Sequence, residues 1–68
     1  MKKAYVFLAT GFEEVEAIGT IDVLRRGGMH VVTVSMTGAA TVKGGHDISV
    51  VADALFEDLS YADADVLV

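Results

Sequence analysis

Hydrophobic residues along the chain form short blocks separated by polar or glycine-rich segments. Ala4–Ala9 is a continuous apolar run of strand length, which is typical of a strand buried on both faces of a parallel sheet. Val31–Val34 is a second run, rich in β-branched residues, and Asp65–Val68 begins a third. The pattern therefore predicts three parallel strands.

A helix is predicted between the first two strands, from Phe12 or Glu13 to Arg26. Thr10 and Glu13 have the spacing of a capping box, and Gly27-Gly28 can supply a left-handed C-terminal cap. Acidic residues gather in the first turns and arginines in the last, which matches the helix dipole. Apolar residues recur every third position and drift around the helix, so we expect it to need cover on more than one side.

The segment after the second strand predicts a short hairpin. Thr41–Lys43 and Ile48–Val51 have strand character, and the four residues between them begin with two glycines. Farther on, residues 53–60 are expected to form a turn of helix, with Asp53 as a possible cap.

Together these elements predict an α/β fold with a mostly parallel sheet. One helix cannot cover both faces of such a sheet, and the last apolar strand begins only at Asp65. We therefore expect residues 1–68 to be one incomplete domain, whose first partner is the remainder of the same polypeptide.

Composition and charge exclude several classes of protein. Hydrophobic residues make up 53% of the 68 residues, which is too many for a disordered chain, and there is no cysteine. The net charge of −5 argues against nucleic-acid binding, and the apolar runs are too short for a membrane span or a signal peptide. We expect a cytoplasmic protein with neither nucleic acid nor membrane as a partner.

Nucleotide and metal motifs are also missing from the sequence. The turn after the first strand has one glycine, which does not match a dinucleotide-binding or P-loop pattern. His46 beside Asp47 is the one pair that resembles metal ligands, and its spacing is weak evidence. We therefore expect no metal and no cofactor.

Three acidic residues, Glu13, Glu14 and Glu16, follow the first strand at its carboxyl end, where open α/β sheets place their sites. They can simply be solvated residues that favour the helix dipole. Glu16 has a second interpretation, because it lies between Val15 and Ala17. If it points into the crevice, apolar neighbours would favour its protonated form and make it a proton donor.

The residues from Ala4 to Ile18, with Gly-Phe-Glu-Glu-Val-Glu at 11–16, and the later Asp-Val-Leu-Arg-Arg-Gly-Gly at 22–28 closely resemble the start of the ThiJ/PfpI superfamily. The resemblance covers essentially the whole chain and favours the parkinsonism-associated deglycase branch. It implies the N-terminal part of a flavodoxin-like, class I glutamine amidotransferase-like, three-layer sandwich, usually a homodimer.

The resemblance also implies roles for particular residues. The family's reactive centre is a cysteine on a strained nucleophile elbow, which lies outside this chain, and Glu16 matches the glutamate that hydrogen-bonds it. Gly11 and Glu13 are assigned to substrate binding. Arg26 corresponds to an arginine near the dimer interface, where it could bind an anion or a partner.

The activity that best fits the branch is cysteine-dependent chemistry on reactive aldehydes or their adducts, of the glyoxalase or deglycase type. Relatives are also described as redox-responsive chaperones, proteases or thiazole-biosynthesis proteins. A signalling receiver is the alternative, with Glu13 and Glu14 near a phosphoacceptor aspartate. In a third possibility, residues 1–68 have no activity of their own.

Overall fold

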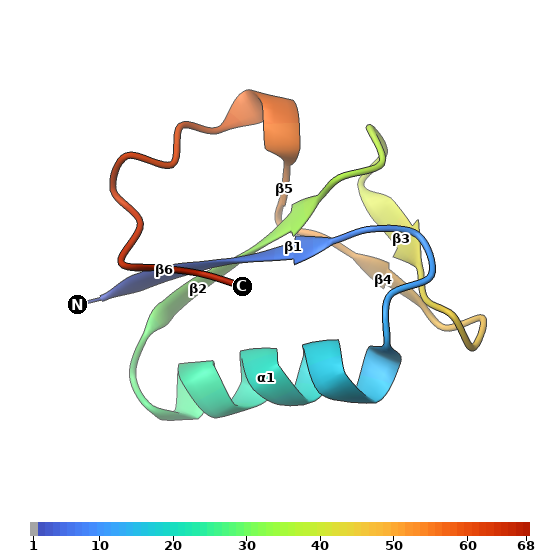
Figure 1. The fold of residues 1–68 in the computed structure, drawn as a ribbon, viewed down its shortest axis with the longest axis horizontal. Coiled ribbons are helices and arrows are strands. Elements are labelled where there is room, and N and C mark those ends of the chain that lie inside the picture. Colours follow the sequence, from blue (N-terminus) through green and yellow to red (C-terminus); the bar gives the residue numbers. More distant parts are fainter. Residues whose placement is uncertain (1) are drawn as a thin grey trace.

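Four parallel strands form the central sheet of the computed structural model, which describes residues 2–68 (Figure 1). Strands β1 (Lys3–Leu8) and β2 (His30–Ser35) pair along their whole lengths. Strands β5 (Ala54–Leu55) and β6 (Val66–Leu67) complete the order β5-β2-β1-β6. The predicted α/β fold and its parallel sheet are confirmed, and β5 is a strand that the pattern had not indicated.

Helix α1 (Glu14–Arg26) occupies the segment where a helix was predicted, but it begins differently. The capping box is wrong: Glu13 takes the N-cap position, and no side chain among the described residues caps the helix there. Thr10 belongs instead to a tight turn, closed by the Phe12 N–H and the Ala9 carbonyl at 3.1 Å. At the other end Gly28 has a φ of +90°, so the left-handed C-terminal conformation is confirmed.

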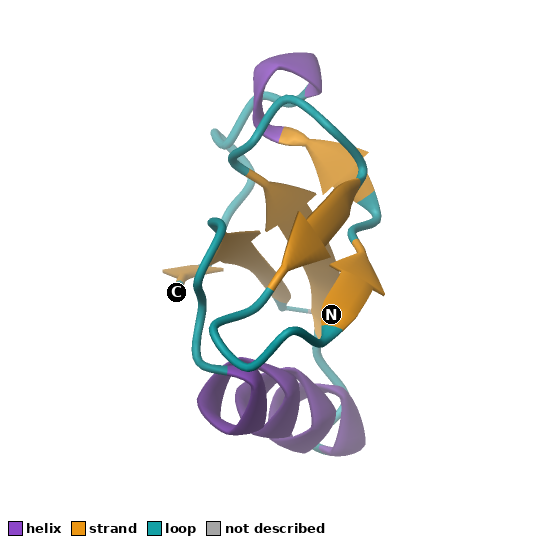
Figure 2. Ribbon diagram, turned by 90° about the vertical axis from the view of Figure 1, so that its right-hand side faces the viewer, coloured by secondary structure: helices purple, strands orange, loops and turns teal. Residues whose placement is uncertain are grey.

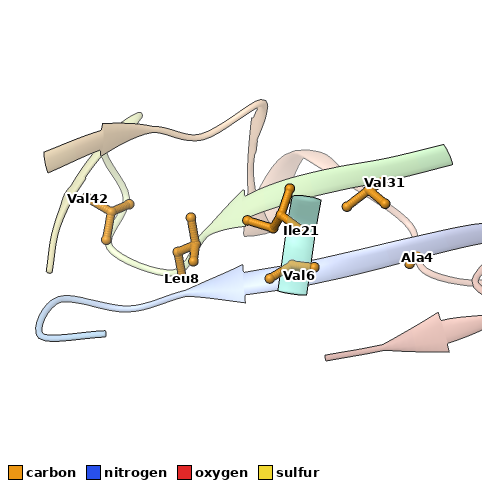
Figure 3. Packing of buried hydrophobic residues seen from close by; sticks show 6 residues of the cluster. All are labelled: Ala4, Val6, Leu8, Ile21, Val31 and Val42. Carbon is orange, nitrogen blue, oxygen red and sulfur yellow. The ribbon is translucent and has the colours of Figure 1, made fainter. Parts of the chain in front are cut away.

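Alternate residues of β1 face two different layers. Ala4, Val6 and Leu8 point toward α1 and pack with Ile21 of the helix and with two valines, Val31 on β2 and Val42 on the hairpin (Figure 3). Tyr5 and Phe7 lie on the other face, where their rings contact Tyr61 at centroid distances of 4.9 and 5.4 Å. Figure 2 shows α1 on one side of the sheet and the short 3₁₀ helix at residues 56–58 on the other. Burial on both faces explains why the run is continuously apolar.

The predicted hairpin is present as β3 (Thr41–Lys43) and β4 (Ser49–Val51), paired antiparallel in a separate two-stranded sheet. Residues 44–48 form its turn, and Asp47 adopts a left-handed φ of 66° there. Figure 1 places this hairpin near the N-terminal end of α1.

The helical turn expected at residues 53–60, with Asp53 as its cap, is only partly correct. Asp53 accepts hydrogen bonds from the backbone N–H and the hydroxyl of Thr33 on β2, both at 3.0 Å. These bonds hold the following residues beside β2, so that they form β5 rather than a helix. A 3₁₀ helix, η1 (Phe56–Asp58), follows.

Apolar side chains remain uncovered on the outer side of α1 and at the β6 edge of the sheet. Val15 is 83% exposed and Val23 66% exposed, and Leu67 on β6 is 60% exposed. The expectation that α1 needs cover on more than one side agrees with these exposures. Within residues 2–68, no helix combines the length and the apolar character required to cross a bilayer.

Candidate functional site

The strand order places a crevice at the carboxyl end of β1. From β1 the chain passes through α1 to β2 on one side, whereas β6 pairs with β1 on the other side. Such a reversal of direction opens a gap beyond the carboxyl ends of the strands, and open α/β sheets bind ligands in this gap. The acidic start of α1 follows directly after β1 and therefore lies at this position.

A cavity of about 240 Å³ occupies this region. Its lining includes Glu13 and Glu16 from the start of the helix, Phe7 from β1 and Val68 just after β6. The structure thus brings together two of the acidic residues selected from the sequence. Glu16 is exposed, as is its neighbour Val15, so residues 2–68 do not enclose it in the apolar surroundings considered from the sequence.

Gly11 supports the turn that leads into the helix. Its φ is +88°, a left-handed conformation that glycine adopts without the steric cost of a side chain. Its N–H donates to the carbonyl of Lys43 on β3 at 2.8 Å, so this donor is already used inside the protein. Gly11 therefore shapes the site through its backbone conformation.

Arg26 lies at the opposite end of α1, about ten residues and roughly 15 Å along the helix axis from Glu16. Its guanidinium pairs with Asp22 one turn earlier at 3.1 Å, which is the pair expected from their spacing. The structure therefore separates Arg26 from the residues that line the cavity.

Glu14 is the acidic residue whose environment the sequence did not reveal. It is 5% exposed and turns toward the hairpin, where Oε2 accepts the backbone N–H of His46 at 2.7 Å and that of Ile48 at 3.3 Å. Its Oε1 lies 2.9 Å from Nδ1 of the His46 ring. Glu13 adds a second carboxylate 3.4 Å from the same nitrogen.

These contacts change the acid–base properties of both partners. Burial by itself would raise the pKa of Glu14, but hydrogen bonds from the His46 ring and from backbone N–H groups outweigh it and lower the pKa to about 2. The hydrogen bond to Glu14, with the negative charges of Glu13 and Glu14, raises the pKa of His46 above its ordinary value. The pair therefore favours a carboxylate and an imidazolium.

The sequence singled out Asp47 as the ligand-like neighbour of His46, but the structure places other acids beside the ring. Asp47, its neighbour, pairs instead with Lys43 at 3.2 Å across the hairpin turn. The acids that contact His46 are 32 and 33 residues earlier in the chain, so no local spacing could identify them. The sequence feature that could have indicated this contact is the pair of glycines before His46, because they let the hairpin turn approach the start of the helix closely.

The fold and the position of the acidic residues define a protein of the flavodoxin-like α/β class, with its site beside the first strand. Comparison with known proteins identifies the family. The sequence model of the DJ-1/PfpI family matches residues 2–68, and the chain belongs to this family. The resemblance seen in the sequence is thereby confirmed.

Individual relatives agree with this assignment. Protein DJ-1 homolog B of Arabidopsis thaliana is 42% identical over 59 residues, and protein dj-1beta of Drosophila melanogaster is 37% identical over 67 residues. These matches cover 87% and 98% of this chain. The chain spans 14% and 36% of the length of these two relatives.

Solved structures of the family superpose closely on the chain. A DJ-1 superfamily protein from Salmonella typhimurium, crystallised as a cysteine-to-alanine mutant, gives a TM-score of 0.92 at 43% identity. Oxidized DJ-1 from Toxoplasma gondii gives 0.94 at 33% identity. Each alignment covers 98% of this chain and 36% of the other, so the chain corresponds to about a third of a family member.

The receiver alternative is not favoured by these findings. It required Glu13 and Glu14 to form an open pair of acidic residues near a phosphoacceptor. Glu14 is instead buried and turned toward the hairpin, where its carboxylate binds His46. The family match gives this alternative no support either.

Proposed function

We propose that residues 1–68 supply the acidic half of a cysteine-dependent active site in a DJ-1/PfpI protein. The observation that carries the proposal is the position of Glu16, which lines the cavity at the switch point of the sheet together with Glu13. The remainder of the same polypeptide would bring the elbow cysteine to this cavity. Residues 1–68 would then form an incomplete domain without activity of their own.

In the proposed mechanism a protonated Glu16 carboxyl donates a hydrogen bond to the cysteine sulfur and keeps its proton. A hydrogen bond from a protonated carboxyl favours the thiolate, which is the nucleophilic form of cysteine. When the thiolate sulfur adds to the carbonyl carbon of a reactive aldehyde, negative charge develops on the oxygen, and a proton from Glu16 can neutralise it. The substrates would be small aldehydes such as methylglyoxal, or the adducts that they form with amines.

Other residues have smaller roles in this proposal. Glu13, in the same cavity, would contact the substrate, while Gly11 would hold the turn that positions both acids. Arg26, at the far end of the helix, would contribute to an interface or bind an anion, and the intact protein would be a homodimer in the cytoplasm. A redox-responsive chaperone is the second candidate function, because the same donor would stabilise an oxidised cysteine.

The experiment measures thiol reactivity in the natural polypeptide that carries these residues. We expect Glu16→Gln to raise the cysteine pKa, seen as a shift to higher pH in the rate of alkylation by iodoacetamide, and to slow the consumption of methylglyoxal. Glu57→Gln, on helix η1 and outside the lining of the cavity, is the matched control and should change neither quantity. Identical alkylation profiles for Glu16→Gln and wild type would remove Glu16 from the mechanism.

A further inference from the structure

Glu13, Glu14 and His46 form a cluster of side chains that can act as metal ligands. One carboxylate oxygen from each glutamate and one ring nitrogen of the histidine all lie within 4.8 Å of one another. The glutamates come from the start of α1, and the histidine comes from the hairpin turn. Because an imidazole from a second element completes it, the cluster differs from an ordinary acidic helix terminus.

The two distances from His46 to the carboxylates are those expected of ligands that share one ion. His46 Nδ1 lies 2.9 Å from Glu14 Oε1 and 3.4 Å from Glu13 Oε1. Two atoms that each bind Zn²⁺ at about 2.0–2.1 Å are separated by roughly 2.9–3.4 Å when their angle at the metal is about 90–110°. The two carboxylates would approach each other through rotation of the Glu13 side chain, which is 55% exposed.

Glu14 is held in the orientation that a ligand needs. Its side chain is 6% exposed, and backbone N–H groups of His46 and Ile48 bind Oε2, which leaves Oε1 directed at the imidazole. Gly44 passes so close to this carboxylate that a Cβ atom there would overlap it. Hydrogen bonds to the second oxygen of a ligating carboxylate, such as those to Oε2 of Glu14, fix the direction of the ligand and increase metal affinity.

The donor set selects the class of ion. One imidazole nitrogen with two carboxylate oxygens suits Zn²⁺ and neighbouring transition metals, whereas Mg²⁺ and Ca²⁺ are bound by oxygen ligands. His46 is 71% exposed, so water can fill the remaining coordination positions. We propose that Glu13, Glu14 and His46 bind one divalent transition-metal ion, with Zn²⁺ as the best match.

A metal ion on Nδ1 of His46 would take the place of the proton that the imidazolium form carries there. An imidazolium loses its Nδ1 proton to solvent and keeps the one on Nε2, so each ion bound to the charged form releases one proton. Zinc binding should therefore weaken as the pH falls. The site shares Glu13 with the cavity of the proposed function but includes neither Glu16 nor a thiol, so zinc binding can be tested separately from the cysteine chemistry.

Zinc titration of the natural polypeptide tests the proposal, with thiols alkylated and no polyhistidine tag present. We expect one equivalent of Zn²⁺ to bind at pH 7.5, His46→Asn to lose it and Glu13→Gln to bind it more weakly. His30→Asn is the matched control, since His30 lies on β2 outside the cluster, and it should retain the full equivalent. Circular dichroism establishes that each variant is folded.

A second measurement uses the unmodified sequence. In histidine-labelled protein, Zn²⁺ should move the ring signals of His46 and leave those of His30 in place. The proposal is overturned if no saturable zinc binding occurs, if His46→Asn binds as wild type does, or if Mg²⁺ competes with Zn²⁺ on equal terms. The first two results would make the cluster a simple ion pair, and the third would show that the imidazole does not select the ion.

Discussion

The ring nitrogen Nδ1 of His46 lies 2.9 Å from Oε1 of Glu14, a carboxylate whose side chain is 6% exposed. This contact joins the turn of the hairpin to the first residue of α1, across 32 positions of sequence. Because the same helical turn carries Glu13 and Glu16, the contact also fixes the position of the candidate site. Its strength should depend on pH.

The stability contributed by this pair is expected to be greatest between about pH 4.5 and 6.5. The pKa of Glu14 is lowered from 4.5 to about 2, so its contribution is present above pH 4.5 and is lost as the pH falls through about 2. The pKa of His46 is raised from 6.5, so its contribution is present below pH 6.5 and is lost as the pH rises through the raised value.

Urea unfolding of wild type and His46→Ala at pH 5.5 and pH 9, with a chelator present, measures this effect. The difference in the free energy of unfolding should be larger at pH 5.5 than at pH 9, because the higher pH favours the neutral imidazole. His30→Ala, on β2, should show no such dependence on pH. A difference that is the same at both pH values would show that the pair is not charged in the folded protein.

Two glycine substitutions should change stability in opposite directions. A Cβ atom at Gly44 would overlap the buried carboxylate of Glu14, so Gly44→Ala should destabilise by about 1–3 kcal/mol. Gly19 lies inside α1, and among residues 2–68 nothing comes within 4 Å of a Cβ built there. Gly19→Ala should therefore stabilise by about 0.5–1 kcal/mol, because alanine has the higher helix propensity. In thermal unfolding, the midpoint temperature should be lower than that of wild type for Gly44→Ala and higher for Gly19→Ala.

The main elements of the fold could be predicted because local patterns determine them. The apolar run at Ala4–Ala9 indicated a strand buried on both faces, and the structure places β1 between two neighbouring strands with packing on either side. The helix was equally clear from its charges and from the glycines that end it. These signals depend on residues a few positions apart, which is the range over which a sequence can be interpreted directly.

The remaining features depend on contacts between distant residues. Asp53 appeared to be a helix cap, but Thr33, twenty positions earlier, offers it two donors, and the segment forms β5 instead. The environment of Glu14 was hidden for the same reason, because it requires the hairpin to pack on the helix. Glu13 and Glu16 were found because both follow a strand end, where the topology of the sheet itself creates a cavity.

The hydroxyl of Tyr5 should contribute measurably to stability. Tyr5 is 1% exposed, and its hydroxyl donates to Asp63 at 2.7 Å, while Lys3 pairs with the same carboxylate at 2.9 Å. Tyr5→Phe removes this bond without changing the packing of the ring, and should cost about 0.5–1.5 kcal/mol in urea unfolding. Tyr61→Phe is the control: its hydroxyl bond to a backbone carbonyl is exposed, so the loss should stay within about 0.5 kcal/mol.

Asp53 and Asp22 both pair with arginines of α1, yet their removal should have different consequences. Asp22 pairs with Arg26 on the exposed surface of the helix, and such pairs contribute about 0–1 kcal/mol. Asp53 pairs with Arg25 at 3.2 Å but also accepts two hydrogen bonds from Thr33, a residue that is 8% exposed.

Asp53→Ala should destabilise by about 1–3 kcal/mol, because it leaves the backbone N–H and the hydroxyl of buried Thr33 without this acceptor. Asp22→Ala, measured beside it by urea unfolding, should cost less than about 1 kcal/mol. Addition of 1 M NaCl provides a further distinction. Salt screens the exposed Asp22 pair, whereas the short hydrogen bonds to Thr33 persist, so the deficit of Asp53→Ala should remain at high salt. Equal losses for the two variants would show that the arginine pair, and not Thr33, determines the contribution of Asp53.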